Sequence, residues 1–65
     1  MTINTQTKEQ FLKVYANLPL GVRKEIILVL NDHGPITWDV AYIEVTNDTA
    51  LSRIILTKLQ ELEII

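Results

Sequence analysis

The sequence predicts a small domain that is all helical or nearly so, with four short helices and at most a vestigial pair of strands. Apolar residues recur at helical spacing in several separate segments. Most of these segments open on a residue type that caps helices, or close on glycine or proline. The chain has 65 residues, so we expect one domain over residues 1–65. Short helices cannot each bury a face alone and must share one core.

The first helix is predicted over residues 7–18. Thr7 and Gln10 have the spacing of a capping box, in which a threonine and a glutamine satisfy the free amides of the first turn. Phe11 and Tyr15 then begin an apolar face. The polar residues 1–6 are expected to be frayed.

The second helix is predicted over residues 19–32. Pro19 suits the first position of a helix, where its missing N–H costs nothing. The apolar stripe of this helix would comprise Val22, Ile26, Val29 and Leu30, with Ile27 and Leu28 beside it. The sequence His33-Gly34-Pro35 then provides a strong stop.

Two more helices follow a short extended link at Pro35 and Ile36. Thr37 is the expected cap of the third helix, and the run Thr46-Asn47-Asp48 the expected start of the fourth, which reaches about residue 62. The apolar face of the third helix would be Trp38, Ala41, Tyr42 and Val45. That of the fourth would be Leu51, Ile54, Ile55, Leu59 and Leu62. A turn of a few residues between two helices is typical of the helix-turn-helix motif.

Composition limits the class of protein. There is no cysteine and one histidine, so disulfides and metal ions are not expected to stabilise this domain. The hydrophobic fraction of 48% indicates a dense core instead. The longest apolar run, residues 26–30, is far shorter than the ~20 residues that cross a bilayer, and no leader peptide is visible. We therefore expect a cytoplasmic protein with no membrane contact.

The segment ITWDVAYIEVTNDTALSRIILTKLQELEII resembles the helix-turn-helix part of winged-helix domains, especially those of small archaeal and bacterial regulators. The resemblance covers about residues 20–65 and leaves residues 7–18 as an extra N-terminal helix. Glu63 stands where that family usually has glycine, and the chain stops at Ile65, where the wing should begin. The resemblance thus implies a reduced or absent wing. Ile64 and Ile65 would either pair with the strand at Ile36 or leave the wing missing.

The resemblance implies a homodimeric transcriptional regulator that places the helix near residues 47–62 in the major groove of double-stranded DNA. Arginine can read guanine through two hydrogen bonds, and hydroxyl side chains can hold phosphates. The candidate DNA contacts are Thr46, Asn47, Thr49, Ser52, Arg53, Thr57, Lys58, Arg23 and Lys24. Two observations oppose this hypothesis: Asp48 would repel phosphate at the helix N-terminus, and the isoelectric point is about 5.1.

The alternative is a winged-helix module that binds another protein and not DNA. A surplus of apolar residues falls outside the predicted core faces, and exposed apolar patches usually mark interfaces. The candidate interface residues are Val40, Ile43, Leu56, Phe11 and Tyr15, the last two on a helix suited to homodimer contacts.

No enzymatic activity is predicted. The chain has no cysteine nucleophile, no glycine-rich phosphate loop and neither of the metal-binding motifs HExxH and CxxC. Asp39 and Glu44 are five residues apart, so they do not share one helix face. Accordingly, no cofactor and no metal site are expected.

Overall fold

The computed structural model describes residues 5–65 of the chain. Within this range the elements are α1 (Thr5–Ala16), the 3-10 helix η1 (Val22–Lys24), β1 (Ile26–Leu30), β2 (Gly34–Thr37), α2 (Trp38–Thr46) and α3 (Ala50–Glu61). The domain is therefore mainly helical with one small antiparallel sheet, and the expected arrangement of four helices is wrong. None of the helices in the described range has the length and apolar character needed to cross a membrane.

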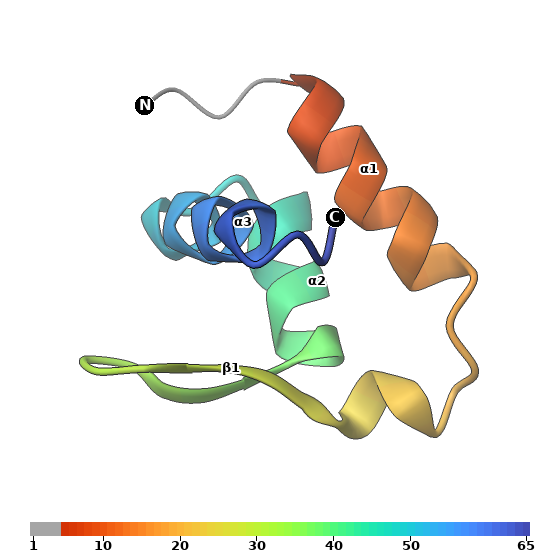
Figure 1. The fold of residues 1–65 in the computed structure, drawn as a ribbon, viewed down its shortest axis with the longest axis horizontal. Helices are drawn as coiled ribbons and strands as arrows, with labels where there is room; N and C mark the ends of the chain where they lie inside the picture. Colours follow the sequence, from red (N-terminus) through yellow and green to blue (C-terminus); the bar gives the residue numbers. More distant parts are fainter. Residues whose placement is uncertain (1–4) are drawn as a thin grey trace.

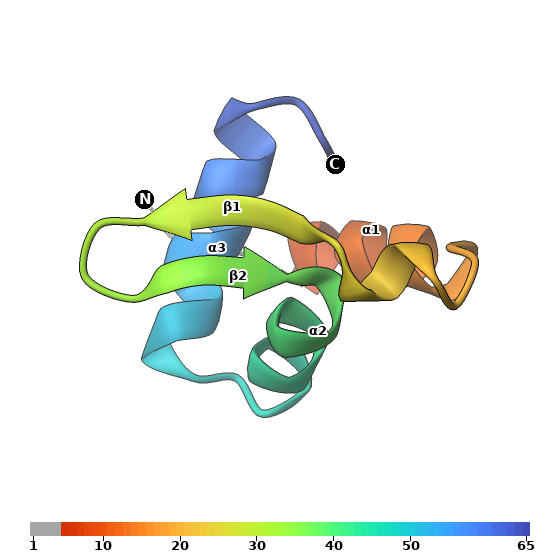
Figure 2. The same cartoon turned by 90° about the horizontal axis from the view of Figure 1, so that it is seen from below.

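The hairpin and α1 lie on different sides of α3. In Figure 1, α1 lies above and to the right of α3 and the hairpin lies below α3, while α2 connects the end of the hairpin to the start of α3. Viewed from below, in Figure 2, the two strands cross over α3, and α2 lies beside β2. The C-terminal end of α3 extends past the β1 side of the hairpin in the same view.

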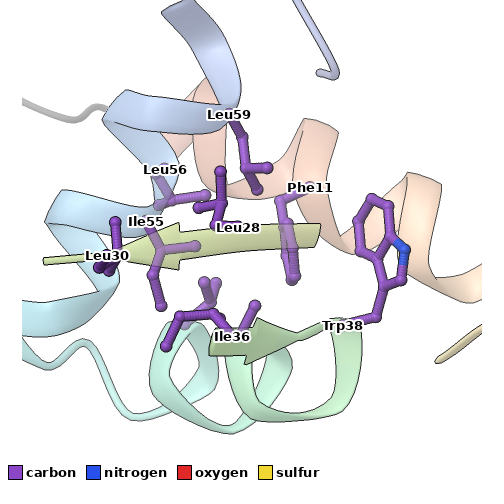
Figure 3. Packing of buried hydrophobic residues seen from close by; sticks show 10 residues of the cluster. Phe11, Leu28, Leu30, Ile36, Trp38, Ile55, Leu56 and Leu59 are labelled. Atoms are coloured by element: carbon purple, nitrogen blue, oxygen red, sulfur yellow. The ribbon is translucent and has the colours of Figure 1, made fainter. Parts of the chain in front are cut away.

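One core lies between these elements. Its buried apolar residues are Phe11, Leu28, Leu30, Ile36, Trp38, Ala41, Val45, Ile55, Leu56 and Leu59. Figure 3 shows side chains from α1, both strands, α2 and α3 converging on this space. Phe11 is 0% exposed, and its ring lies 5.9 Å from that of Trp38. Trp38 is thus a core residue, as the sequence predicted.

The predicted second helix, residues 19–32, is wrong. Its first part forms η1 and its second part forms β1. In β1, Leu28 and Leu30 are buried while Val29 between them is exposed, which is the period of two that a strand gives to its side chains. Leu28 pairs with Ile36 across the hairpin. The helix prediction failed because a run of five apolar residues fits a strand and a helix equally well, and pairing with β2 decides between them.

The expected helix stop at His33-Gly34-Pro35 spans the end of the hairpin turn and the first two residues of β2. The His33 N–H donates to the Leu30 carbonyl over 3.3 Å, which closes the turn. Gly34 has a φ of 74°, a conformation that residues with a Cβ rarely adopt. The extended link predicted at residues 35–36 is therefore the middle of β2.

The first helix begins and ends two residues earlier than predicted. It starts at Thr5, so Thr7 lies inside α1 and is buried, not at the cap position. Residues 5–6 of the segment expected to be frayed are helical, and residues 1–4 lie outside the described range. The helix ends at Ala16, before Pro19.

The two C-terminal helices follow the prediction closely. Thr37 caps α2 as predicted, since its Oγ1 accepts a 3.1 Å hydrogen bond from the Val40 N–H. The cap of α3 is Thr49, one residue beyond the three proposed. Asp48, just before it, has a φ of 51° and ends α2 in the left-handed conformation.

The C-terminal segment ends α3 without forming a strand. Glu63 has a φ of 58°, and the Ile64 N–H donates to the Leu59 carbonyl over 2.9 Å, which together form a Schellman motif. Of the two alternatives for the C-terminus, the pairing of Ile64 and Ile65 with Ile36 is wrong, because the sheet in the described residues consists of β1 and β2 alone. A glutamate occupies this left-handed position, which normally favours glycine.

Candidate nucleic-acid interface on α3

The turn between α2 and α3 is held by its own side chains. The Thr46 hydroxyl donates to the Tyr42 carbonyl over 2.9 Å, and the Asn47 amide donates to the Ile43 carbonyl over 2.7 Å. Both side chains therefore satisfy carbonyls at the C-terminal end of α2. Both are exposed and were candidate DNA contacts, but the Thr46 hydroxyl donor and one donor of the Asn47 amide are already engaged.

Side-chain hydrogen bonds to the backbone also stabilise the first turn of α3. The Thr49 Oγ1 accepts from the Ser52 N–H over 3.1 Å and donates to the Glu44 carboxylate over 2.7 Å. The Ser52 hydroxyl donates to the Thr49 carbonyl over 2.6 Å. Ser52 is 4% exposed, so burial removes it from the set of candidate DNA contacts.

Asp48 lies before the N-terminus of α3 and is paired with a cation. Its carboxylate is 2.9 Å from the Lys8 Nζ, which joins α1 to the turn between α2 and α3. The carboxylate side chain is 73% exposed, so water screens this pair and its energy is small. The pair nevertheless reduces the repulsion that Asp48 would exert on an approaching phosphate.

Arg23 and Lys24 do not join the candidate residues of α3. The Arg23 guanidinium lies 4.4 Å from the centre of the Tyr15 ring, and it donates to the Tyr15 carbonyl over 3.2 Å. Arg23 therefore serves to cap α1. Lys24 is exposed, but η1 lies on the opposite side of α2 from α3 in both views (Figures 1 and 2).

Four neighbouring side chains remain on the outer face of α3. Arg53, Ile54, Thr57 and Lys58 line one shallow surface hollow of about 240 Å³. Lys58 is 3.7 Å from Glu61, and both side chains are more than half exposed, so this contact leaves the ammonium available. The face thus combines two cations, a hydroxyl and an apolar side chain. Sequence reasoning missed Ile54, which it assigned to the core, although Arg53 and Thr57 flank it on the same face.

The candidate partner-interface residues divide into two groups. Phe11 and Leu56 are 0% and 3% exposed, so the prediction that they form a partner surface is wrong. Val40 and Ile43 are exposed, one helical turn apart on α2. Leu56 was misassigned because β1 also packs on the core and widens the buried face of α3, whereas Phe11 of α1 is buried against Trp38.

Tyr15 is half-buried between α1 and α2. Its ring stacks on that of Tyr42 at 4.3 Å, and its hydroxyl donates to the Asp39 carboxylate over 2.6 Å. This hydrogen bond, and secondly burial, raise the pKa of Tyr15 above the usual tyrosine value. Together with Arg23 and Leu12, the two tyrosines line a second hollow of about 430 Å³. Tyr15 therefore serves the internal packing of the domain.

Comparison of the chain with protein-family models, with curated proteins and with solved structures finds no match. The function is therefore inferred from the residues of this chain and their geometry.

Proposed function

We propose that this chain is a DNA-binding domain of the winged-helix type, that it acts in cytoplasmic transcriptional regulation, and that α3 is its recognition helix. The observation that supports this proposal most strongly is the grouping of Arg53, Ile54, Thr57 and Lys58 on the exposed face of α3. The three-residue connection between α2 and α3 has the length of a helix-turn-helix turn.

Each of these side chains has a role that matches the chemistry of a major groove. Arg53 can donate two parallel hydrogen bonds to the O6 and N7 atoms of guanine. Ile54 offers an apolar contact for the methyl group of thymine. Thr57 and Lys58 can bind phosphate oxygens, which would fix the position of the helix along the duplex. The capped turn before α3 would hold this face rigid.

The electrostatic balance sets the expected affinity. The net charge is −2, so non-specific attraction to DNA is weak. If Lys58 neutralises one phosphate while Arg53 binds a base, the logarithm of the binding constant should fall with that of the salt concentration with a slope of about −1 per protomer. Specific contacts to bases must therefore contribute a large share of the affinity.

The proposal is tested by fluorescence anisotropy with mixed-sequence duplex DNA at low and at moderate salt. The Arg53→Ala/Lys58→Ala variant should lose binding. Lys13→Glu is the matched control, since it makes the same two-unit change in net charge at an exposed position of α1. Salt-sensitive binding that survives in the control supports the proposal. No binding at low salt, or equal loss in both variants, contradicts the assignment of α3.

Two observations favour a second function, a protein-binding module that does not bind DNA. Val40 and Ile43 are exposed on α2, one helical turn apart, and the isoelectric point of about 5.1 disfavours nucleic acid. The two functions predict different sensitive residues. If the chain is a protein-binding module, Ile43→Ser should abolish binding to the partner protein, while Arg53→Ala should leave this binding unchanged.

A further inference from the structure

The β1 strand has one edge that faces away from β2. Within residues 5–65 the sheet has two strands, so β1 pairs on one side only. The Leu30 carbonyl accepts from the His33 N–H and therefore points towards the hairpin turn. Because backbone groups alternate along a strand, the N–H and carbonyl of Val29 point to the free edge. Val29 thus presents a donor and an acceptor at the free edge.

The two edges of the hairpin differ in their capacity to pair. Pro35, opposite Val29, has no N–H to offer at the β2 edge. The β1 residues are Ile26, Ile27, Leu28, Val29 and Leu30, with no proline and no charge. Proteins usually protect free edges with charged residues, proline or bulges. The irregularity between Ile26 and Leu28 confines the unprotected part of β1 to residues 28–30.

We propose that this edge pairs with β1 of a second copy of the chain, in antiparallel orientation, about a twofold axis at Val29. The Val29 N–H of each copy would donate to the Val29 carbonyl of the other, and Leu28 would lie opposite Leu30 of the other copy. The two hairpins would then form one four-stranded antiparallel sheet. This inference concerns self-association and does not depend on DNA binding.

Two observations favour a second copy over a different partner. The pairing segment is uncharged and apolar at every position, so the twofold operation opposes no like charges. The outer face of the joined sheet would carry a continuous apolar row of Pro35 and Val29 from both copies, and both residues are exposed in the single chain.

The first test measures dimerisation by sedimentation equilibrium without DNA. Val29→Lys places two lysines against each other at the twofold axis and should raise the dimer Kd at least about 100-fold. Leu20→Lys is the matched control, since Leu20 and Val29 are both 74% exposed, and it should change the Kd less than about threefold. A chain that stays monomeric at about 1 mM overturns the proposal.

The second test detects the strand pairing directly, in the wild-type chain. In a mixture of isotope-labelled and unlabelled chains, filtered NMR spectra should show a contact between the α-protons of Leu28 and Leu30 from different copies, because this pair is not hydrogen bonded and lies close. A dimer without this contact, or one that a folded Val29→Lys variant forms as tightly as the wild type, overturns the proposal.

Discussion

The Tyr15 hydroxyl donates a 2.6 Å hydrogen bond to the Asp39 carboxylate and so joins α1 to the first turn of α2. The same tyrosine stacks on Tyr42 and contacts the Arg23 guanidinium, which follows α1 in the chain. One side chain of α1 therefore contacts groups from both η1 and α2. Since α2 leads directly into the turn before α3, this cluster helps to hold the face that we propose binds DNA.

The stability of the domain should fall at high pH because of Tyr15. The hydrogen bond to Asp39, followed by burial, raises the pKa of Tyr15, so the folded state holds the phenol proton more tightly than the unfolded state. The contribution is complete below the unfolded pKa and is lost as pH rises through the folded pKa. Urea unfolding from about pH 9 to about pH 11 should show this decline.

The Tyr15→Phe variant is the control for that decline. It lacks the hydroxyl but retains the ring, so its stability should be lower than that of the wild type at neutral pH and less dependent on pH above about 10. Tyr42 and the lysines titrate in both proteins. Parallel curves for the two proteins would show that Tyr15 is not the source of the pH dependence.

Glu63→Gly should stabilise the domain by about 1 kcal/mol. Glu63 has a φ of 58°, a conformation that costs free energy for any residue with a Cβ, and the Schellman hydrogen bonds around it involve only the backbone. Thermal and urea unfolding of the variant measure the gain. Glu61→Gly, in the last turn of α3, is the matched substitution and should destabilise. An unchanged or lower stability for Glu63→Gly would contradict the left-handed assignment.

Thr49→Ala should destabilise the domain by about 1 kcal/mol, the usual effect of removing a helix cap. The variant loses the acceptor of the Ser52 N–H and the donor to Glu44. Thr49→Ser retains the hydroxyl and should remain within about 0.5 kcal/mol of the wild type. Equal stabilities of the alanine and serine variants would mean that the cap is not formed.

Leu28→Ala and Val29→Ala should differ sharply in stability. Leu28 is buried against the core, and its truncation should cost about 2–4 kcal/mol. Val29 is exposed, so its truncation should cost less than about 1 kcal/mol in the monomer. The comparison tests the strand assignment of β1, and it is made by urea unfolding at low protein concentration. Similar losses would contradict the alternation along β1.

The sequence predicted the second half of the fold better than the first. Capping residues and spacing were enough to locate α2 and α3, because Thr37 and the polar turn mark boundaries that depend on local chemistry. The strand β1 was missed because the run IILVL has no polar residue to reveal its period. β1 forms because it pairs with β2, and the periodicity of one segment gives no information about its pairing with another.

The same missing hairpin explains the errors in the candidate sites. Because β1 and β2 cross α3, the buried face of α3 includes Leu56 and leaves Ile54 and Leu62 exposed. The prediction that Arg53 and Lys58 are exposed cations rested on residue type and is correct. Residue type alone did not show that Ser52 turns inward, because serine also serves as a helix cap and as a phosphate contact. Its spacing from Ile55 and Leu59 places it on the buried face of the helix.

The most direct test of the proposed function is an NMR titration of the ¹⁵N-labelled chain with a DNA duplex selected for binding from a random pool. The account predicts that amide shifts change most around Arg53, Thr57 and Lys58 on α3, and little on β1 or α1. Selection that yields no enriched duplex, or shift changes centred on Val40 and Ile43 of α2, would contradict the account and identify α3 as a structural helix.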